Sequence, residues 1–372
     1  MSTSCATIGT EWLNPVGTRL ALPGRNNNFR GKCELSRRGF AFNGTVAAGA
    51  SVMITSVVAE PSKGLEKLPF KPEGYNYWTW RGHKIHYVVE GEGFPVVLIH
   101  GFGASAFHWR YNIPELAKKY KVYALDLIGF GWSEKPLIEY DAFIWRDQVV
   151  DFLKEIVIEP AVLVGNSLGG FTALVAAAFL TDQVKGVTLL NSAGQFGDAS
   201  SAAEGTEETA LQIYILNPLK ESFQRVFLGF LFWQVKQPAL IESVLKSVYI
   251  NSSNVDDYLI NSITRPTADP NAGEVYYRLV TRFILNLRKY TLDNVLRNLS
   301  CPLLLVWGDL DPLAGPANAN RIKEFYPNTT VVNLKAGHCP HDEVPELVNE
   351  ALLEWLSSTV TPASSLETLS EI

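Results

Sequence analysis

Several features that would place a protein in a familiar class are scarce in this chain. Its 372 residues include only four cysteines and two methionines. The cysteines have neither the spacing of a zinc site nor that of a disulfide framework; they are Cys5, Cys33, Cys301 and Cys339. No group of His, Asp and Glu has metal-ligand spacing, and no glycine-rich stretch matches a nucleotide-binding fingerprint. We therefore expect a protein of a reduced compartment that uses no metal and no cofactor.

Basic charge and long apolar runs are also lacking. Lys and Arg number 32 against 38 Asp and Glu, a net charge of -6, and no basic cluster alternates with aromatic residues. This balance argues against nucleic acid as a partner. No stretch of about 18 uninterrupted apolar residues predicts a transmembrane helix. With 47% hydrophobic residues, the chain is long enough for one large α/β domain with an insertion.

Acidic residues are nearly absent from residues 1–59. This segment has six Lys and Arg but only Glu11 and Glu34 as acids, and Ser, Thr, Gly and Asn are frequent. These properties are typical of a transit peptide, so we expect a chloroplast protein, in the stroma or at the thylakoid. Arg37 and Arg38 precede a moderately apolar run, which leaves open a twin-arginine signal for the thylakoid lumen. An unstructured N-terminus is the third alternative.

The strongest local signal is the pentapeptide Gly165-Asn166-Ser167-Leu168-Gly169. A short β-branched stretch precedes it and an Ala-rich apolar stretch follows it. This pattern predicts a strand, a tight turn with Ser167 at its apex, and a helix, which together form a nucleophile elbow. The helix N-terminus would offer N–H groups to an anion formed there. The alternative is a structural serine in a tight turn.

Strand and helix patterns alternate on both sides of a long interruption. After a linker at 60–77, the alternation along 78–194 and 291–358 predicts an α/β fold with a doubly wound, mostly parallel sheet. From 195 to 290 no strand pattern appears and helical patterns predominate. We therefore expect a helical cap inserted over the carboxyl edge of the sheet, and a frayed tail at 359–372.

One apolar run in the predicted cap stands out. It contains Phe230, Phe232 and Trp233 within a helical pattern. These side chains are candidates for substrate binding. A helix packed on the sheet would explain the same run.

Three side chains with complementary chemistry follow predicted strands. A Ser hydroxyl is a weak nucleophile that needs an adjacent base, and a carboxylate can orient a His that acts as this base. The carboxyl ends of parallel strands meet at one edge of a sheet. We therefore predict Ser167 as the nucleophile and His338 as the base. Asp311 is the predicted orienting acid, with Asp309 as the second choice.

Other polar residues near these positions have weaker claims. His341 is a second candidate for the base, although packing against a helix is its expected role. Cys339 adjoins His338 and could be redox-active, but a small packing residue is the simpler interpretation. Asn191 also follows a strand, yet it cannot serve as a carboxylate.

The loop His100-Gly101-Phe102-Gly103 follows another predicted strand. Together with the elbow, it predicts an oxyanion hole made by the backbone N–H groups of Phe102 and Leu168. Each such donor is typically worth about 3 kcal/mol in the transition state. Gly101 and Gly103 would let this backbone approach a substrate.

These motifs, in this order, resemble the capped α/β-hydrolases. The matching segments are His100–Gly103, Asp126–Ser133, Gly165–Gly170, Trp307–Pro312 and Gly337–Glu343. Within that family, the elbow and the plastid-like leader look most like the plant pheophytinase and chlorophyll dephytylase-like proteins. The resemblance implies serine-mediated hydrolysis of a small hydrophobic ester through an acyl-enzyme, with association at the thylakoid membrane surface.

Two other functions remain open at this point. Dehalogenases and epoxide hydrolases of the family use an Asp where Ser167 stands, so their activities are not expected. Carbon–carbon hydrolases of the meta-cleavage type share the elbow and a Ser triad. Some relatives of the fold act as small-molecule receptors, which the fold alone does not exclude. Rapid turnover of simple esters would favour the enzyme over the receptor.

Overall fold

The computed structural model describes residues 64–197, 217–283 and 290–360. The predicted transit peptide and parts of the predicted cap and tail lie outside these ranges. Every candidate site residue lies within them.

The described residues form an eight-stranded sheet in the order β1-β2-β4-β3-β5-β6-β7-β8. The strands are β1 (Asn76–Trp80), β2 (His83–Glu90), β3 (Pro95–Ile99), β4 (Lys121–Leu125), β5 (Ala161–Asn166), β6 (Val184–Leu190), β7 (Leu303–Gly308) and β8 (Thr329–Leu334). β2 pairs antiparallel with β1 and β4, and every other neighbouring pair is parallel. The predicted mostly parallel sheet is therefore confirmed.

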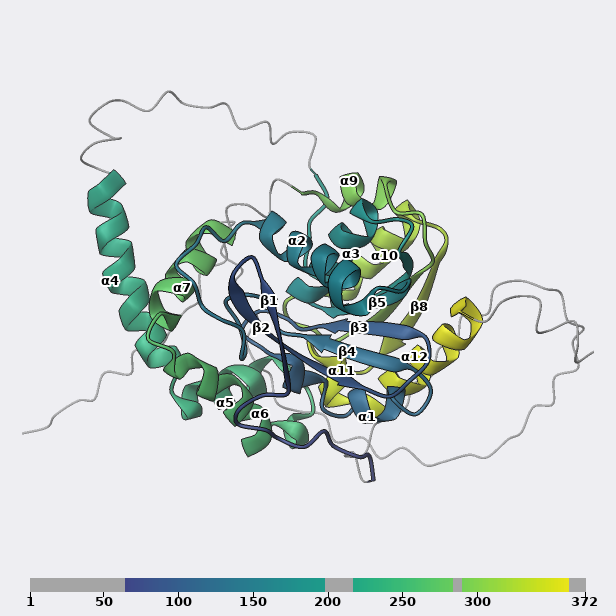
Figure 1. Cartoon of the computed structure of the whole chain (residues 1–372), viewed down its shortest axis with the longest axis horizontal. Helices are drawn as coiled ribbons and strands as arrows, with labels where there is room; N and C mark the ends of the chain where they lie inside the picture. Colours follow the sequence, from purple (N-terminus) through teal and green to yellow (C-terminus); the bar gives the residue numbers. More distant parts are fainter. Residues whose placement is uncertain (1–63, 198–216, 284–289, 361–372) are drawn as a thin grey trace, which may run out of the picture. The chain divides into compact units, whose positions relative to one another are not determined.

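Helices cover both faces of this sheet (Figure 1). One face carries α2 (Ala142–Phe152) with the short turn η2 (Leu153–Val157), α3 (Leu168–Phe179), α9 (Leu292–Arg297) and α10 (Pro316–Phe325). The other carries η1 (Ala106–Trp109), α1 (Ile113–Leu116), α11 (Pro340–Glu343) and α12 (Pro345–Val360). Because both faces are covered, β3, β5 and β7 consist of buried residues throughout, as parallel sheets require.

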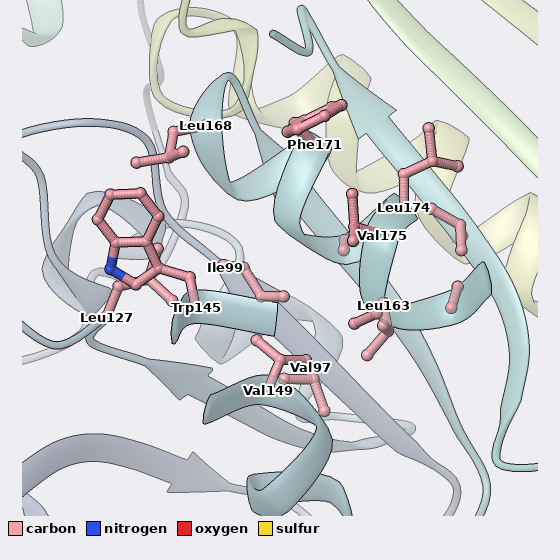
Figure 2. Close-up of a cluster of buried hydrophobic side chains, with 14 of the residues drawn as sticks. Val97, Ile99, Leu127, Trp145, Val149, Leu163, Leu168, Phe171, Leu174 and Val175 are labelled. Carbon is pink, nitrogen blue, oxygen red and sulfur yellow. The ribbon is translucent and has the colours of Figure 1, made fainter. Parts of the chain in front are cut away.

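The apolar layer beneath the elbow fixes the position of α3. Val97 and Ile99 of β3 pack with Leu163 of β5 against α2 and α3, as Figure 2 shows. Leu168, the first residue of α3, turns its side chain into this layer near Trp145. Burial of such side chains contributes roughly 2 kcal/mol each. The helix that begins at the elbow is therefore anchored from its first residue.

A helical insert joins β6 to β7. Its elements are α4 (Asn217–Val235), α5 (Pro238–Val248), η4 (Ser252–Asn254), α6 (Asp257–Thr264), η5 (Arg265–Ala268), α7 (Ala272–Arg278) and η6 (Leu279–Phe283). Within the described part of the insert there is no strand. α4 packs against α7, where the rings of Phe232 and Tyr276 lie 5.2 Å apart. The predicted fold class, a parallel α/β sheet with an inserted helical segment, is confirmed.

A buried arginine joins the α5–α6 part of the insert to the sheet domain. Arg110 Nε donates to Asp342 Oδ1 at 2.7 Å, and its Nη1 donates to Asp256 Oδ1 at 2.5 Å. Its Nη2 donates to the carbonyl of Asn254 at 2.6 Å, and the hydroxyl of Tyr249 donates to Asp342 Oδ2 at 3.0 Å. We call these five residues the Arg110 clamp.

Candidate active site

The elbow places Ser167 in a backbone conformation that few side chains adopt. Its φ is 52° and its ψ is -117°, and such a left-handed residue persists only where its surroundings impose it. A Cβ on Gly165 would overlap the backbone of Gly169, and a Cβ on Gly169 would overlap the carbonyl of Ile99. The two glycines are therefore required by close packing of the turn. The turn is held further by the Ser167 N–H, which donates to Leu190 O at 3.0 Å.

His338 and Asp311 meet beyond the ends of β8 and β7. His338 Nδ1 lies 2.7 Å from Asp311 Oδ2, and Asn191 Nδ2 donates to the same oxygen at 2.8 Å. The N–H of Leu313 donates to the other oxygen at 2.7 Å. Burial alone would raise the pKa of Asp311, but the contact with His338 and these N–H donors outweigh it and lower the pKa. Asp311 is therefore held as a carboxylate that can accept a hydrogen bond from Nδ1–H of His338.

The backbone of His338 is fixed from three directions. Its N–H donates to Val248 O of the insert at 2.9 Å, and its carbonyl accepts from Asn166 Nδ2 at 2.9 Å. The N–H of the preceding Gly337 donates to Glu343 Oε2 at 2.7 Å. The insert, the elbow strand and α11 therefore position the imidazole together.

Sequence reasoning missed two of these positioning residues and dismissed a third. Asn166 and Glu343 hold the His338 loop, and no local pattern singles them out for that role. Asn191 follows a strand, but the sequence alone assigns it no part in the triad because it is not a carboxylate. The structure gives it another role, since it donates to Asp311 and accepts from the N–H of Gly308 at 2.8 Å.

The second-choice residues lie in different environments. Asp309 Oδ1 is buried without a hydrogen-bond partner among the described residues, and burial raises the pKa of this carboxyl. Both ring nitrogens of His341 are likewise buried and unpartnered within the described ranges, and the ring packs 4.2 Å from that of Trp109. Burial also lowers the pKa of His341 well below its usual value. Neither residue shares the His338–Asp311 contact.

The two predicted oxyanion donors flank Ser167. A Cβ on Gly101 would lie 3.3 Å from Ser167 Cβ, so the loop that carries Phe102 runs directly beside the elbow. Leu168 is the first residue of α3, where backbone N–H groups have no partner within the helix. The loop that carries Phe102 and the first turn of α3 therefore both lie beside the serine, and the role of the Phe102 and Leu168 N–H groups as an oxyanion hole remains a prediction.

A cavity of about 440 Å³ brings the candidate residues together with the insert. Ser167, His338, Phe102 and Cys339 line its floor at the sheet edge. The insert supplies a mainly apolar wall that includes Phe232, Val235, Ile241, Val244, Leu245 and Val248. Ligand cavities commonly have this size and this mixture of apolar walls with few polar groups. Burial raises the pKa of the Cys339 thiol well above its usual value, so this residue lines the cavity in its neutral form.

The structure places only one of the three predicted substrate-binding residues at the cavity. Phe232 lines the cavity, whereas Phe230 and Trp233 are exposed on α4 outside the lining.

One cation that sequence reasoning did not consider is buried in the wall of the cavity. Lys135 donates to Gly131 O at 2.7 Å and to Ser133 O at 3.2 Å, and burial lowers its pKa. The cavity is thus apolar with an ammonium group in its wall.

Two other features are absent from the described part of the chain. No three His, Cys, Asp or Glu side chains gather there as metal ligands would. None of the helices in these ranges has the length and hydropathy needed to span a bilayer.

Known proteins resemble this chain in sequence and in fold. Residues 95–345 match the model of the alpha/beta hydrolase fold family. A chloroplastic pheophytinase of Arabidopsis thaliana is 28% identical over 327 residues, which cover 76% of this chain and 66% of that protein. A 2-hydroxymuconate semialdehyde hydrolase of Pseudomonas sp. strain CF600 is 44% identical over 108 residues, only 28% of this chain and 38% of that enzyme. The structure of a serine hydrolase involved in carbazole degradation has a TM-score of 0.61 and 25% identity, covering 76% of this chain and 98% of that one.

The chain therefore belongs to the α/β-hydrolase family, as its motifs predicted. It is an enzyme of the hydrolase class, and it is similar to pheophytinase over about three quarters of its length.

Proposed function

We propose that the protein is a serine hydrolase that cleaves a hydrophobic carboxylic ester. The observation that carries this proposal is the 2.7 Å contact of His338 Nδ1 with Asp311 Oδ2, together with the cavity that both His338 and Ser167 line. A carboxylate in that position holds the imidazole with its Nε2 free to accept a proton. The apolar wall of the cavity suits an acyl or alcohol group with little polarity.

The proposed reaction has two halves. Ser167 Oγ attacks the ester carbonyl carbon while its proton passes to His338 Nε2, and the N–H groups of Phe102 and Leu168 bind the oxyanion. The C–O bond to the alcohol then breaks, and His338 returns the proton to the departing alkoxide. Water next attacks the acyl-enzyme with His338 as base, which releases the acid and restores Ser167.

The proposed substrate class is a phytyl-type ester of a chlorophyll pigment in the chloroplast. Similarity to a protein named as a chloroplastic pheophytinase supports this, as does the basic, acid-poor composition of residues 1–59. A fluorescent fusion of the full chain tests the compartment. Fluorescence confined to plastids is the expected result, and fluorescence in the cytosol or another organelle would contradict it.

A substrate panel tests the reaction. The purified protein and its Ser167→Ala variant are incubated with pheophytin, chlorophyll, a galactolipid and simple p-nitrophenyl esters. Phytol release by the wild type alone supports a pigment dephytylase. Cleavage of short esters alone would keep the hydrolase and remove the pigment substrate. Very slow turnover of every ester, with ligand-dependent capture of a partner protein, would favour a receptor.

A carbon–carbon hydrolase of the meta-cleavage type is the second candidate function. Lys135 and Lys236 both line the cavity, and an ammonium group there could bind the carboxylate of a keto-acid substrate. The similarity to the 2-hydroxymuconate semialdehyde hydrolase supports the same alternative. Turnover of a 2-hydroxy-6-oxo-dienoic acid that exceeds turnover of every ester would favour it.

A further inference from the structure

The outer face of α4 carries a row of exposed apolar side chains. Its members recur every three or four residues, so they share one face of the helix; they are Phe223, Val226, Phe227, Phe230 and Trp233. The rings of Phe223 and Phe227 stack at 6.3 Å, and those of Phe230 and Trp233 lie 6.2 Å apart. We call this row the α4 stripe. Apolar groups exposed in a row, rather than singly, mark an interaction surface.

The opposite face of α4 already has its packing partners. Arg225 forms an ion pair with Glu274 of α7 at 3.1 Å, and Phe232 packs on Tyr276 of the same helix. Figure 1 shows α4 lying on the outer side of α7. The helix is thus oriented by polar and aromatic contacts on its inner face, and the stripe faces away from them.

Exposed apolar side chains are also present on α5, which lines the cavity together with α4. Phe232 and Val235, on the inner face of α4, line the cavity. On α5, Val244 both lines the cavity and is exposed, and Leu240, one turn earlier, is exposed as well. The two helices that carry the exposed apolar groups therefore also form the cavity wall.

The charge of this part of the insert differs from that of the chain. Residues 217–248 contain two acidic and four basic residues, of which Arg225 and Lys246 form ion pairs and Lys220 and Lys236 are the other two, whereas the whole chain has a net charge of -6. An amphipathic helix with Phe and Trp on its apolar face and basic residues nearby is typical of helices that lie in the membrane interface. Basic residues near such a face are attracted to anionic lipids. A positively charged segment in an acidic protein fits this partner.

We propose that the α4 stripe docks the protein on an anionic lipid bilayer, so that a lipid-borne ester enters the cavity directly from the membrane. The entry of an ester rests on the proposed function, whereas the docking itself needs no catalysis. A second copy of the chain or another segment of this chain would be the competing occupant of the stripe.

Vesicle flotation with two matched double variants tests the docking. The full-length protein is mixed with vesicles of phosphatidylcholine containing phosphatidylglycerol, and the bound fraction is measured. The test variant is Phe223→Ser with Phe227→Ser, which changes side chains that are 72% and 51% exposed. The control is Ile158→Ser with Phe179→Ser, at 69% and 59% exposed outside the insert. Both variants keep the basic N-terminal segment, so its own attraction to lipid is equal in each.

We expect the test variant to bind vesicles about tenfold more weakly than the wild type, because interfacial binding scales with buried apolar area. The control variant should bind as the wild type does. Hydrolysis of a water-soluble short ester should be equal in all three proteins, while hydrolysis of a long-chain ester held in vesicles should fall about tenfold in the test variant alone.

Three results would overturn the docking proposal. One is equal flotation of the test variant and the wild type, and another is no flotation of the wild type. The third is a wild-type dimer in sedimentation that only the test variant dissociates, which would assign the stripe to a second copy. Because flotation is measured on the Ser167→Ala variant as well, failure of the proposed catalysis would leave this test intact.

Discussion

The sheet edge and the helical insert build the two sides of one cavity by different means. At the edge, polar groups are fixed by short hydrogen bonds, as around Asp311, whose two oxygens together accept from His338, Asn191 and Leu313. The insert contributes mainly apolar side chains and is joined to the sheet domain through the Arg110 clamp. Under the proposed function, the edge supplies the chemistry, whereas the insert selects and admits the substrate.

The largest expected effect on activity follows from removing the Ser167 hydroxyl at the sheet edge. Ser167→Ala should lower kcat for ester hydrolysis by about 10⁴-fold or more, because the nucleophile and its base act as a unit. The elbow should keep its fold, since alanine differs only by the hydroxyl. Steady-state kinetics and thermal unfolding check both expectations. Retained turnover in a pure sample would remove Ser167 from the mechanism.

The next effect distinguishes two carboxylates of the same loop. Asp311→Asn should lower kcat by about 10³-fold, because the amide cannot hold His338 in the required tautomer. Asp309→Asn should change kcat less than tenfold, because Asp309 does not contact His338. Parallel kinetics of the two variants give the ranking. A greater loss in Asp309→Asn would reverse the assignment of the acid.

A stability measurement tests the Arg110 clamp, which connects the insert with the sheet domain. Arg110→Met leaves the buried Asp342 without its cation, and breaking a buried pair in this way costs about 3–5 kcal/mol of unfolding free energy. Arg81→Met is the matched control, because Arg81 is exposed and forms a surface pair with Asp147 at 3.1 Å. Such a pair is worth about 0–1 kcal/mol. Urea unfolding measures both, and equal losses would mean that the Arg110 clamp does not stabilise the fold.

The sequence predicted the edge better than the insert, for a physical reason. Strand periodicity and the spacing around Ser167 are local, so the sheet, the elbow and the placement of Asp311 after a strand could be read from short stretches. The ion pair of Arg110 with Asp342 joins residues that are 232 positions apart in the sequence, and no local pattern predicts such a pair. Helical periodicity likewise indicates that α4 is amphipathic, but it does not tell which face the rest of the insert will cover.

The smallest expected effect on the free energy of unfolding comes from Asp256 of the Arg110 clamp. It distinguishes the contribution of the Asp256 charge from that of its hydrogen-bond geometry. Asp256 accepts from Arg110 and from Lys67, and it also caps α6 by accepting from the N–H of Leu259 at 3.0 Å. Burial alone would raise its pKa, but Arg110, the Leu259 N–H and Lys67 outweigh burial and lower it. Asp256→Asn removes the charge while keeping a side chain that caps helices well.

This change should cost about 1 kcal/mol at pH 7, a modest amount because the Asp256 side chain is 35% exposed and solvent screens the pair. A pKa that is lower in the folded than in the unfolded state stabilises the fold above the unfolded value, about 3.9, and the stabilisation is lost as the pH falls through the folded value. The difference in unfolding free energy between wild type and Asp256→Asn should therefore be constant from pH 5 to 7 and shrink below about pH 4. Urea unfolding at pH 7 and near pH 3.5 measures it. A difference that stays constant across this range would show that Asp256 joins the insert to Arg110 of the sheet domain through hydrogen-bond geometry rather than through its charge.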